Sequence, residues 1–204
     1  MFSVSNLSCS RGEKRLFSGV SFSLQDGESL HLEGDNGVGK TSLLRLACGL
    51  SPLEQGEICW QGKPVAENRD EFRSNLAYLG RQLGLKEDLT ALENLQSHAA
   101  VAGQQLSLSQ AKAALAQLGL RGRENLPVRV LSQGQKRRTA LARLVVSTAK
   151  LWILDEPFVA LDPAAQLALS AVINAHLSSQ GMVLLTSHQA VPLAGQGRSY
   201  RLTA

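Results

Sequence analysis

The sequence is poor in cysteine and has no long apolar run. Its three cysteines, Cys9, Cys48 and Cys59, are odd in number and scattered, which argues against a disulfide framework and against a cysteine-based metal site. No apolar segment approaches the ~18–20 residues that a helix needs to span a bilayer. The N-terminus lacks the basic start and apolar core of a secretory signal. We therefore expect buried, reduced thiols and a chain that stays in the cytoplasm.

Aromatic residues are also scarce, at 4% of the chain, and basic residues exceed acidic ones only slightly, 21 to 17. The densest basic cluster is Lys136, Arg137, Arg138 and Arg143, and no aromatic residue interleaves with it. No recognised nucleic-acid-binding motif surrounds this cluster. We interpret it as the solvated face of a helix and expect no nucleic-acid partner.

What the sequence does contain is a phosphate-binding loop pattern, G-x-x-x-x-G-K-[ST], at 34–42. Strand-like alternation precedes the loop, and an apolar helix at 42–48 follows it. Glycines let successive N–H groups point inward around phosphate oxygens, and the helix N-terminus favours the same anion. Lys40 can bridge the outer phosphates and Thr41 can ligate Mg²⁺. The predicted nucleotide-binding residues here are Gly34, Asp35, Asn36, Gly37, Val38, Gly39, Lys40, Thr41 and Ser42.

The simpler interpretation of this segment is a glycine-rich turn that happens to lie beside a lysine. The strand–loop–helix frame disfavours it, because a chance match would not place the pattern between a strand and a helix. The chain is therefore predicted to bind a nucleoside triphosphate.

Short apolar segments alternate with helix signals along the chain, which predicts an α/β fold with a largely parallel sheet. Strands are expected at 2–8, 16–24, 29–33, 57–60, 76–80, 151–154, 182–186 and 198–202. Four helices after the loop helix are expected from their capping signals. They begin at Thr90 (to about 101), Ser109 (to 119), Ser132 (to about 149) and Asp162-Pro163.

Two acids follow the apolar strand 151–154, at the end where open parallel sheets bind ligands. Asp155 is predicted to hold Mg²⁺, and Glu156 is placed to polarise an attacking water as general base. Surface acids are the alternative, but the abrupt change from four apolar residues to Asp-Glu-Pro disfavours it.

Ser132, Gly134 and Gln135 lie at a predicted helix N-terminus, which is a ready anion site. A plain helix cap explains these residues equally well on the sequence alone. Asp162-Pro163 is likewise a good N-cap and first-turn pair.

In order, these motifs resemble the nucleotide-binding subunit of ATP-binding cassette (ABC) transporters over essentially the whole chain. The matching segments are the phosphate loop at 34–41, Gln82 at the Q-loop, the signature at 131–135, Walker B at 151–156, the D-loop at 160–162 and the switch histidine His188. The resemblance implies a P-loop NTPase (RecA-like) fold with a mostly parallel sheet, an N-terminal antiparallel β subdomain and an inserted helical subdomain. The single domain 1–204 would divide into a core of 1–84 with 150–204 and a helical subdomain of 85–149.

The same resemblance implies roles that the residues alone leave open. Ser132, Gly134 and Gln135 would meet the γ-phosphate of ATP held by a second subunit, so two copies would close head to tail. Gln82 would sense Mg²⁺ and the water, His188 would contact the γ-phosphate, and Asp162 would act in the D-loop. The family often stacks adenine on an aromatic side chain. Here Arg11 is the candidate for stacking, which leaves GTP open beside ATP.

Within the family, the chain most resembles the ATP-binding subunit of the haem exporter of cytochrome c maturation. The stretches that carry this resemblance are 49–65, 76–95, 131–144, 151–162 and 184–189. It implies a peripheral protein, docked as two copies on integral membrane subunits at the cytoplasmic face of the inner membrane. ATP would drive delivery of haem to the periplasm or its release onto a haem chaperone. We expect no haem ligand site in this chain.

Three alternatives follow from the same residues. The cassette could serve a lipid, drug or lipoprotein exporter. A soluble cassette acting on nucleic acid or ribosomes would need a second cassette, a coiled-coil arm or a basic tail, none of which the sequence contains. A nucleotide-switched scaffold with little hydrolysis is disfavoured by the presence of both Glu156 and His188.

Overall fold

Five parallel strands form the sheet on which the candidate site is built. The computed structural model describes residues 1–187, 193 and 196–203, and the strand order is β6-β7-β8-β3-β9. Every residue of β7 and β8 is buried, as expected of central strands covered on both faces. The predicted α/β class with a largely parallel sheet is confirmed. The strands are β6 (Leu76–Leu79), β7 (Leu151–Leu154), β8 (Met182–Thr186), β3 (Glu28–Glu33) and β9 (Gln196–Arg201).

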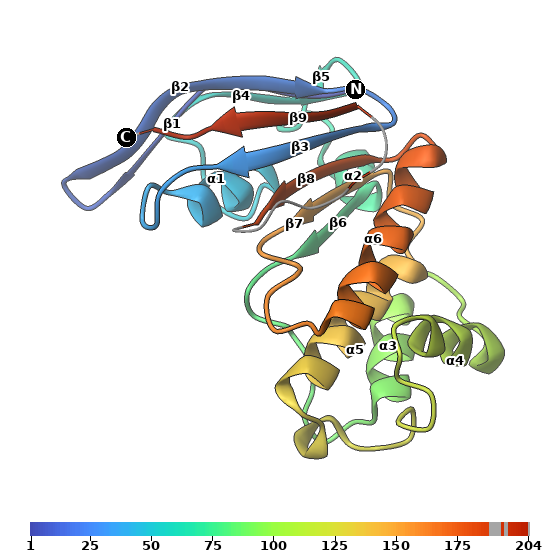
Figure 1. Cartoon of the computed structure of the whole chain (residues 1–204). Helices are drawn as coiled ribbons and strands as arrows, with labels where there is room; N and C mark the ends of the chain where they lie inside the picture. Colours follow the sequence, from blue (N-terminus) through green and yellow to red (C-terminus); the bar gives the residue numbers. More distant parts are fainter. Residues whose placement is uncertain (188–192, 194–195, 204) are drawn as a thin grey trace. The chain divides into compact units, whose positions relative to one another are not determined.

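A second, antiparallel sheet of order β2-β1-β4-β5 forms from the N-terminal part of the chain (Figure 1). Its longest strands pair from Phe2 opposite Leu24 to Arg11 opposite Lys14. The main hydrophobic core contains buried residues of β1, β2 and β4, of the parallel strands and of α1 (Lys40–Ala47). The predicted N-terminal antiparallel sheet is confirmed, and it shares this core with the parallel sheet. Its strands are β1 (Phe2–Arg11), β2 (Lys14–Leu24), β4 (Gln55–Trp60) and β5 (Lys63–Pro64).

The chain forms two compact units, each described by itself. The first contains residues 1–80, 149–157 and 174–204, and the second contains 81–148 and 158–173. The helices of the second unit pack through contacts of α3 with α4 and of both with α5. The remaining elements are α2 (Arg69–Ser74), α3 (Ala91–Val101), α4 (Leu108–Gln117), η1 (Val128–Val130), α5 (Gln133–Val145) and α6 (Pro163–Ser178).

Capping boxes begin α3, α4 and α5. Thr90 and Ser132 cap α3 and α5 as predicted, each with a reciprocal side chain three residues on. The predicted cap of the second helix, Ser109, is wrong. Ser107 caps α4 instead, because Gln110 can return a hydrogen bond to its backbone N–H. The residue three positions after Ser109 is Lys112, whose ammonium cannot accept one.

Several predicted boundaries also differ from the structure. α5 ends at Val145 rather than near 149, because the chain must turn into the fully buried strand that begins at Leu151. β9 covers Gln196–Arg201, so it begins two residues and ends one residue earlier than predicted. The short elements α2, β5 and η1 were not predicted, since two to six residues carry too little periodicity to be recognised.

A half-buried histidine packs against a strand of the parallel sheet. The rings of His176 and Trp152 stack with centroids 3.7 Å apart and planes 7° from parallel. Gly181 leaves room for this stack, because a Cβ there would lie 2.2 Å from Nε2 of His176. Burial lowers the pKa of His176 from its ordinary value of 6.5.

We expect His176 to make stability fall on acidification. Its pKa is lower in the folded than in the unfolded chain, so below about pH 6.5 the unfolded chain binds more protons. The free energy of unfolding should then drop by no more than about 1.4 kcal/mol per pH unit for this one proton. Urea unfolding at pH 5.5 and 7.5 measures the difference. His176→Phe keeps a stacked ring but has no titrating nitrogen, so the difference in free energy of unfolding between the two pH values should be smaller in this variant. A difference as large as in the parent would exclude His176 as the source.

Candidate nucleotide-binding site

The phosphate loop connects β3 to α1 and depends on two glycines with positive φ. Gly34 has φ +141°, and a Cβ there would lie 2.6 Å from the backbone oxygen of Leu202. Gly39, the N-cap of α1, has φ +110°, and a Cβ would lie 3.0 Å from the ring of Phe17. Both the backbone conformation and the lack of space therefore require glycine at these positions.

Lys40 is the first residue of α1 and is buried, with its ammonium turned back into the loop. Its Nζ donates to the carbonyl oxygens of Gly34 at 2.6 Å and Asp35 at 3.0 Å. The loop thus encloses one positive charge at the N-terminus of a helix. This arrangement provides a cation and backbone N–H donors for phosphate.

Two strand ends bring a carboxylate next to the loop. Asp155 follows β7 and is 1% exposed. Its Oδ2 accepts a hydrogen bond from Oγ1 of Thr41 at 2.8 Å, and its Oδ1 accepts one from Oγ1 of Thr186 at 2.9 Å. The structure therefore joins the predicted Mg²⁺ residues Thr41 and Asp155, which are 114 positions apart in the chain.

Glu156 is buried and holds a strained backbone conformation with φ +52°. Its N–H donates to Oγ1 of Thr186 at 2.9 Å. The Thr186 hydroxyl thus accepts a hydrogen bond from the Glu156 backbone and donates one to the Asp155 carboxylate, which fixes the backbone of Glu156 and the side chain of Asp155. A non-glycine residue in this region indicates a conformation imposed by its surroundings, as is frequent at functional sites.

Sequence reasoning missed Thr186 and Tyr78. Thr186 is a hydroxyl residue directly after four apolar residues at a strand end, the same signal that identified Asp155. Tyr78, on β6, is half-buried, and burial together with the charges of Cys48 and Asp155 raises its pKa to about 12. Tyr78 therefore stays neutral beside Asp155 at physiological pH.

We expect Thr186→Val to disturb the site without changing its shape. The substitution removes one hydrogen bond from Asp155 and one from Glu156 inside a fully buried environment. Stability should fall by about 1–3 kcal/mol, and nucleotide turnover should fall with it. Thr186→Ser, which keeps the hydroxyl, is the matched control. Chemical unfolding and turnover assays compare the two variants. Equal stability and equal turnover of the valine and serine variants would rule out a role for the hydroxyl.

The predicted signature residues lie in the second unit, at the start of α5. Ser132 accepts from the N–H of Gln135 at 3.2 Å, and Gln135 returns a hydrogen bond to the Ser132 N–H at 2.9 Å. Gly134 faces the predicted D-loop, because a Cβ on it would lie 3.1 Å from the backbone oxygen of Ala160. The structure therefore places signature and D-loop side by side within this unit.

The remaining predicted site residues are not brought to the phosphate loop by the described contacts. Asp162 accepts from the N–H of Ala165 at 2.8 Å as the N-cap of α6 and lies 3.9 Å from Arg138. Gln82 is exposed at the start of the second unit, and Arg11 is exposed at the end of the β1–β2 hairpin. His188 lies outside the described residues.

The donor set fits a magnesium–nucleotide complex. Thr41 and Asp155 offer hydroxyl and carboxylate oxygens, which are the ligands that Mg²⁺ prefers, and the bound phosphates commonly supply the others. The described residues contain no group of three or more His, Cys, Asp or Glu able to hold a metal by themselves.

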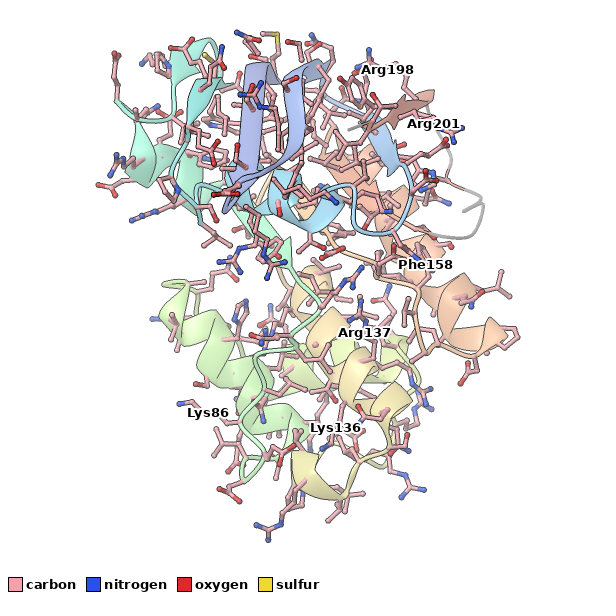
Figure 2. The ribbon with its side chains drawn as sticks, turned by 90° about the vertical axis from the view of Figure 1, so that its left-hand side faces the viewer. Lys86, Lys136, Arg137, Phe158, Arg198 and Arg201 are labelled. Atoms are coloured by element: carbon pink, nitrogen blue, oxygen red, sulfur yellow. The ribbon has the colours of Figure 1, made fainter. Side chains whose placement is uncertain are left out.

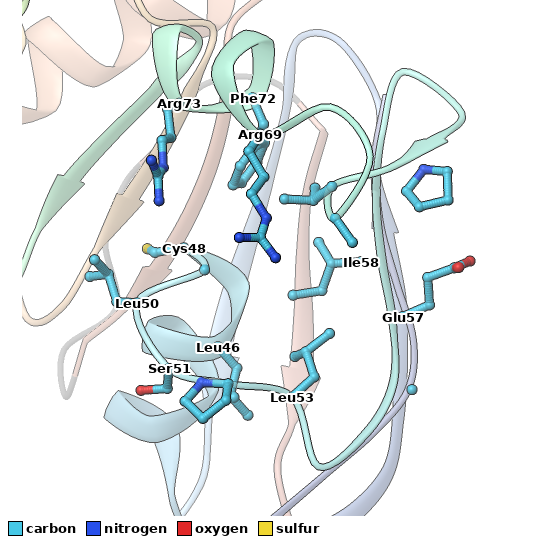
Figure 3. A pocket seen from close by; sticks show the side chains of 16 residues that line it. Leu46, Cys48, Leu50, Ser51, Leu53, Glu57, Ile58, Arg69, Phe72 and Arg73 are labelled. Atoms are coloured by element: carbon cyan, nitrogen blue, oxygen red, sulfur yellow. The ribbon is translucent and has the colours of Figure 1, made fainter.

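A cavity of about 550 Å³ in the first unit is separate from this site (Figure 3). Leu46, Ile58 and Phe72 contribute apolar surface to it, and the guanidinium groups of Arg69 and Arg73 reach toward it from α2. None of the predicted site residues lines this cavity.

The chain matches the family model described as ABC transporter over residues 17–159. It is 54% identical over 203 residues to the cytochrome c biogenesis ATP-binding export protein CcmA of Dechloromonas aromatica, covering 99% of this chain and 100% of the relative. The protein of the same name from Pseudomonas aeruginosa is 46% identical over 193 residues, covering 95% of each chain.

Solved structures show the same fold. An ABC transporter ATP-binding protein from Pyrococcus furiosus superposes with a TM-score of 0.85 at 22% identity, covering 98% of this chain and 96% of that one. A dimeric ATP-binding cassette in a post-hydrolysis state with ADP and Pi gives a TM-score of 0.81 at 21% identity, covering 93% and 88%. Among the described residues, no helix has the length and apolar character needed to cross a membrane.

Proposed function

The chain belongs to the ABC transporter family, and from that premise we propose that it is the ATP-hydrolysing subunit of an exporter that delivers haem across the inner membrane for cytochrome c biogenesis. The observation that carries the proposal is the alignment with a cytochrome c biogenesis ATP-binding export protein, which is 54% identical over 203 residues and so covers nearly the whole chain. Similarity in the ATP-binding motifs alone would be shared by any cassette. The matched segments beyond those motifs are what favour this transport system.

ATP binds at the phosphate loop in this proposal. Lys40 exchanges its hydrogen bonds to the Gly34 and Asp35 carbonyls for the outer phosphates, and the N–H groups of the loop contact phosphate oxygens. Thr41 and Asp155 would hold Mg²⁺, with Gln82 as a further ligand. When bound, the metal would supply positive charge to offset that of the phosphates.

Glu156 acts as the general base. It lies directly after β7, at the carboxyl end of the parallel sheet, and its backbone is fixed by Thr186. A buried carboxylate on a fixed backbone can orient a water and accept its proton as the water attacks the γ-phosphorus and the bond to the ADP oxygen breaks. His188 contacts the same phosphate and positions this pair. Arg11 stacks on the base.

A second copy of the chain completes each site. The exposed N-terminus of α5, with Ser132, Gly134 and Gln135, presents helix-end N–H groups to the partner's γ-phosphate, and Asp162 in the D-loop lies beside them. The fold is shared with a cassette whose structure is dimeric. Head-to-tail closure of two copies therefore buries two ATP molecules.

The dimer is peripheral to the inner membrane and docks on integral membrane subunits at the cytoplasmic face. No residue of this chain is assigned to haem itself. Closure on ATP and opening after hydrolysis drive the membrane subunits, which deliver haem to the periplasm or release it onto a haem chaperone.

The proposal is tested in cells that make c-type cytochromes. Deleting the gene should abolish haem-stained holo-cytochrome c, and the unaltered chain should restore it. The deletion strain must retain apo-cytochrome, which an immunoblot verifies. Normal holo-cytochrome c in the deletion strain would overturn the haem assignment. Purification of the intact membrane complex without any cytochrome c biogenesis subunit would point to an exporter of a lipid, drug or lipoprotein.

A further inference from the structure

The segment that follows Gln82 is folded around one buried asparagine. Asn94, on α3, is 5% exposed, and its amide oxygen accepts from the N–H of Lys86 at 2.8 Å. Its two amide N–H donors are shared among the carbonyl oxygens of Lys86, Leu89 and Thr90, at 2.9, 3.2 and 2.9 Å. One side chain thus fixes the backbone of 86–90 as a single piece.

Side chains from near both ends of α5 bind this piece and the residues just before it. Nη2 of Arg143 donates to the carbonyl oxygen of Gly84 at 2.7 Å. Nζ of Lys136 pairs with Glu87 at 2.9 Å, and the Lys136 side chain is only 16% exposed. Figure 2 shows Lys136 on α5 and Lys86 on the segment that leads to α3. Gly84 has φ +60°, and a Cβ on it would lie 3.6 Å from Nη1 of Arg143.

The Arg143 side chain is partly buried, whereas the Gly84 end of the contact is exposed. Burial lowers the pKa of Arg143 from its ordinary value, although the guanidinium stays charged. Burial and the charge of Arg143 also lower the pKa of His98. A charge-assisted hydrogen bond to a carbonyl is stronger where water competes less. At 2.7 Å, and with a charged donor, the Arg143–Gly84 hydrogen bond should be stronger than one between neutral groups.

We propose that Arg143 is a positioning residue that makes the segment after Gln82 move together with the signature helix α5. The inference rests on the proposed ATPase function. There Gln82 is a ligand at the ATP bound by its own chain, whereas Ser132, at the start of α5, contacts the ATP bound by the partner. Because Arg143 joins the two within one unit, a displacement of α5 displaces the Gln82 segment. The two ATP sites of the dimer then respond to each other.

Arg143→Ala tests the link in the full-length protein assembled with its membrane subunits. With MgATP varied, kcat should fall about tenfold, because loss of positioning away from the reacting atoms lowers rates by one to two decades. KM should change by less than about threefold, since the phosphate loop itself is untouched. The Hill coefficient should move toward 1 from a higher value in the parent. Arg143→Lys keeps a charged donor and should recover much of kcat.

Amide hydrogen exchange provides a readout that needs no hydrolysis. Exchange in 82–90 should rise at least about tenfold in Arg143→Ala, because the Gly84 carbonyl loses its partner and the segment opens more often. Unchanged exchange there would overturn the link, whatever the ATPase result. Absence of ATP hydrolysis by the parent complex would instead refute the proposed function.

Two further variants separate the link from a general loss of structure. Arg129→Ala is the control, because it removes an ion pair between the same segment and an arginine outside α5. The side chains of Arg129 and Asp88 are 60% and 88% exposed, so ATPase kinetics and amide exchange should stay at parent values. If Arg143→Ala unfolds, Arg143→Met removes the charged donor while keeping most of the side-chain volume at this partly buried position. Parent-like kinetics and exchange in a folded Arg143→Met protein would contradict the proposal.

Discussion

Glu156→Gln should leave ATP binding intact while lowering turnover by roughly 10²–10⁴-fold, the usual contribution of a general base. Glutamine has nearly the shape of glutamate and keeps the backbone N–H that donates to Thr186, so the φ of +52° and the neighbouring hydrogen bonds should persist. It cannot accept the proton of the attacking water. The loss should therefore fall on kcat rather than on nucleotide affinity.

A second consequence is a trapped dimer. With ATP bound and hydrolysis blocked, the closed head-to-tail pair has no route to open, so gel filtration with ATP should show dimers that the parent forms only transiently. Glu67→Gln is the matched control, because Glu67 is an exposed acid of the same unit outside the site. Turnover by Glu156→Gln at the rate of the Glu67→Gln control would show that another group takes the proton.

The fold could be predicted from the sequence because its signals are local. The apolar run of β7 and the strand–loop–helix pattern at 34–42 each depend on neighbouring residues, and both were found where expected. The error at Ser109 has the same origin. Two serines in one short stretch compete for the cap, and the choice depends on a side chain three residues further on.

The candidate site was harder to predict from the sequence than the fold, because it depends on the order of the strands in the sheet. Asp155 could be identified from its position after an apolar strand, whereas Thr186 became relevant only once β8 was seen to pair with β7. A sequence does not state which parallel strands are neighbours. The link from Arg143 to Gly84 spans 59 positions and has no sequence pattern of its own.

Lys40→Ala should act at the opposite stage from Glu156→Gln, by removing productive nucleotide binding. The ammonium is the one charged group that the structure encloses within the loop, where it bonds to Gly34 and Asp35. A hydrogen bond between charged groups contributes about 1.5–3 kcal/mol, so ATP affinity should fall roughly 10–100-fold. Titration with a fluorescent ATP analogue measures this directly.

The fold should survive the Lys40→Ala change, since the freed carbonyls belong to a loop that can recruit water. Lys63→Ala, at an exposed lysine of the same unit, is the control for lost charge alone. Thermal unfolding without nucleotide should agree for both variants, and added ATP should raise the unfolding temperature of the control much more than that of Lys40→Ala. Equal stabilisation of the two variants by ATP would mean that the phosphates are held without Lys40. Binding at the loop would then rest on its backbone N–H groups and on the N-terminus of α1.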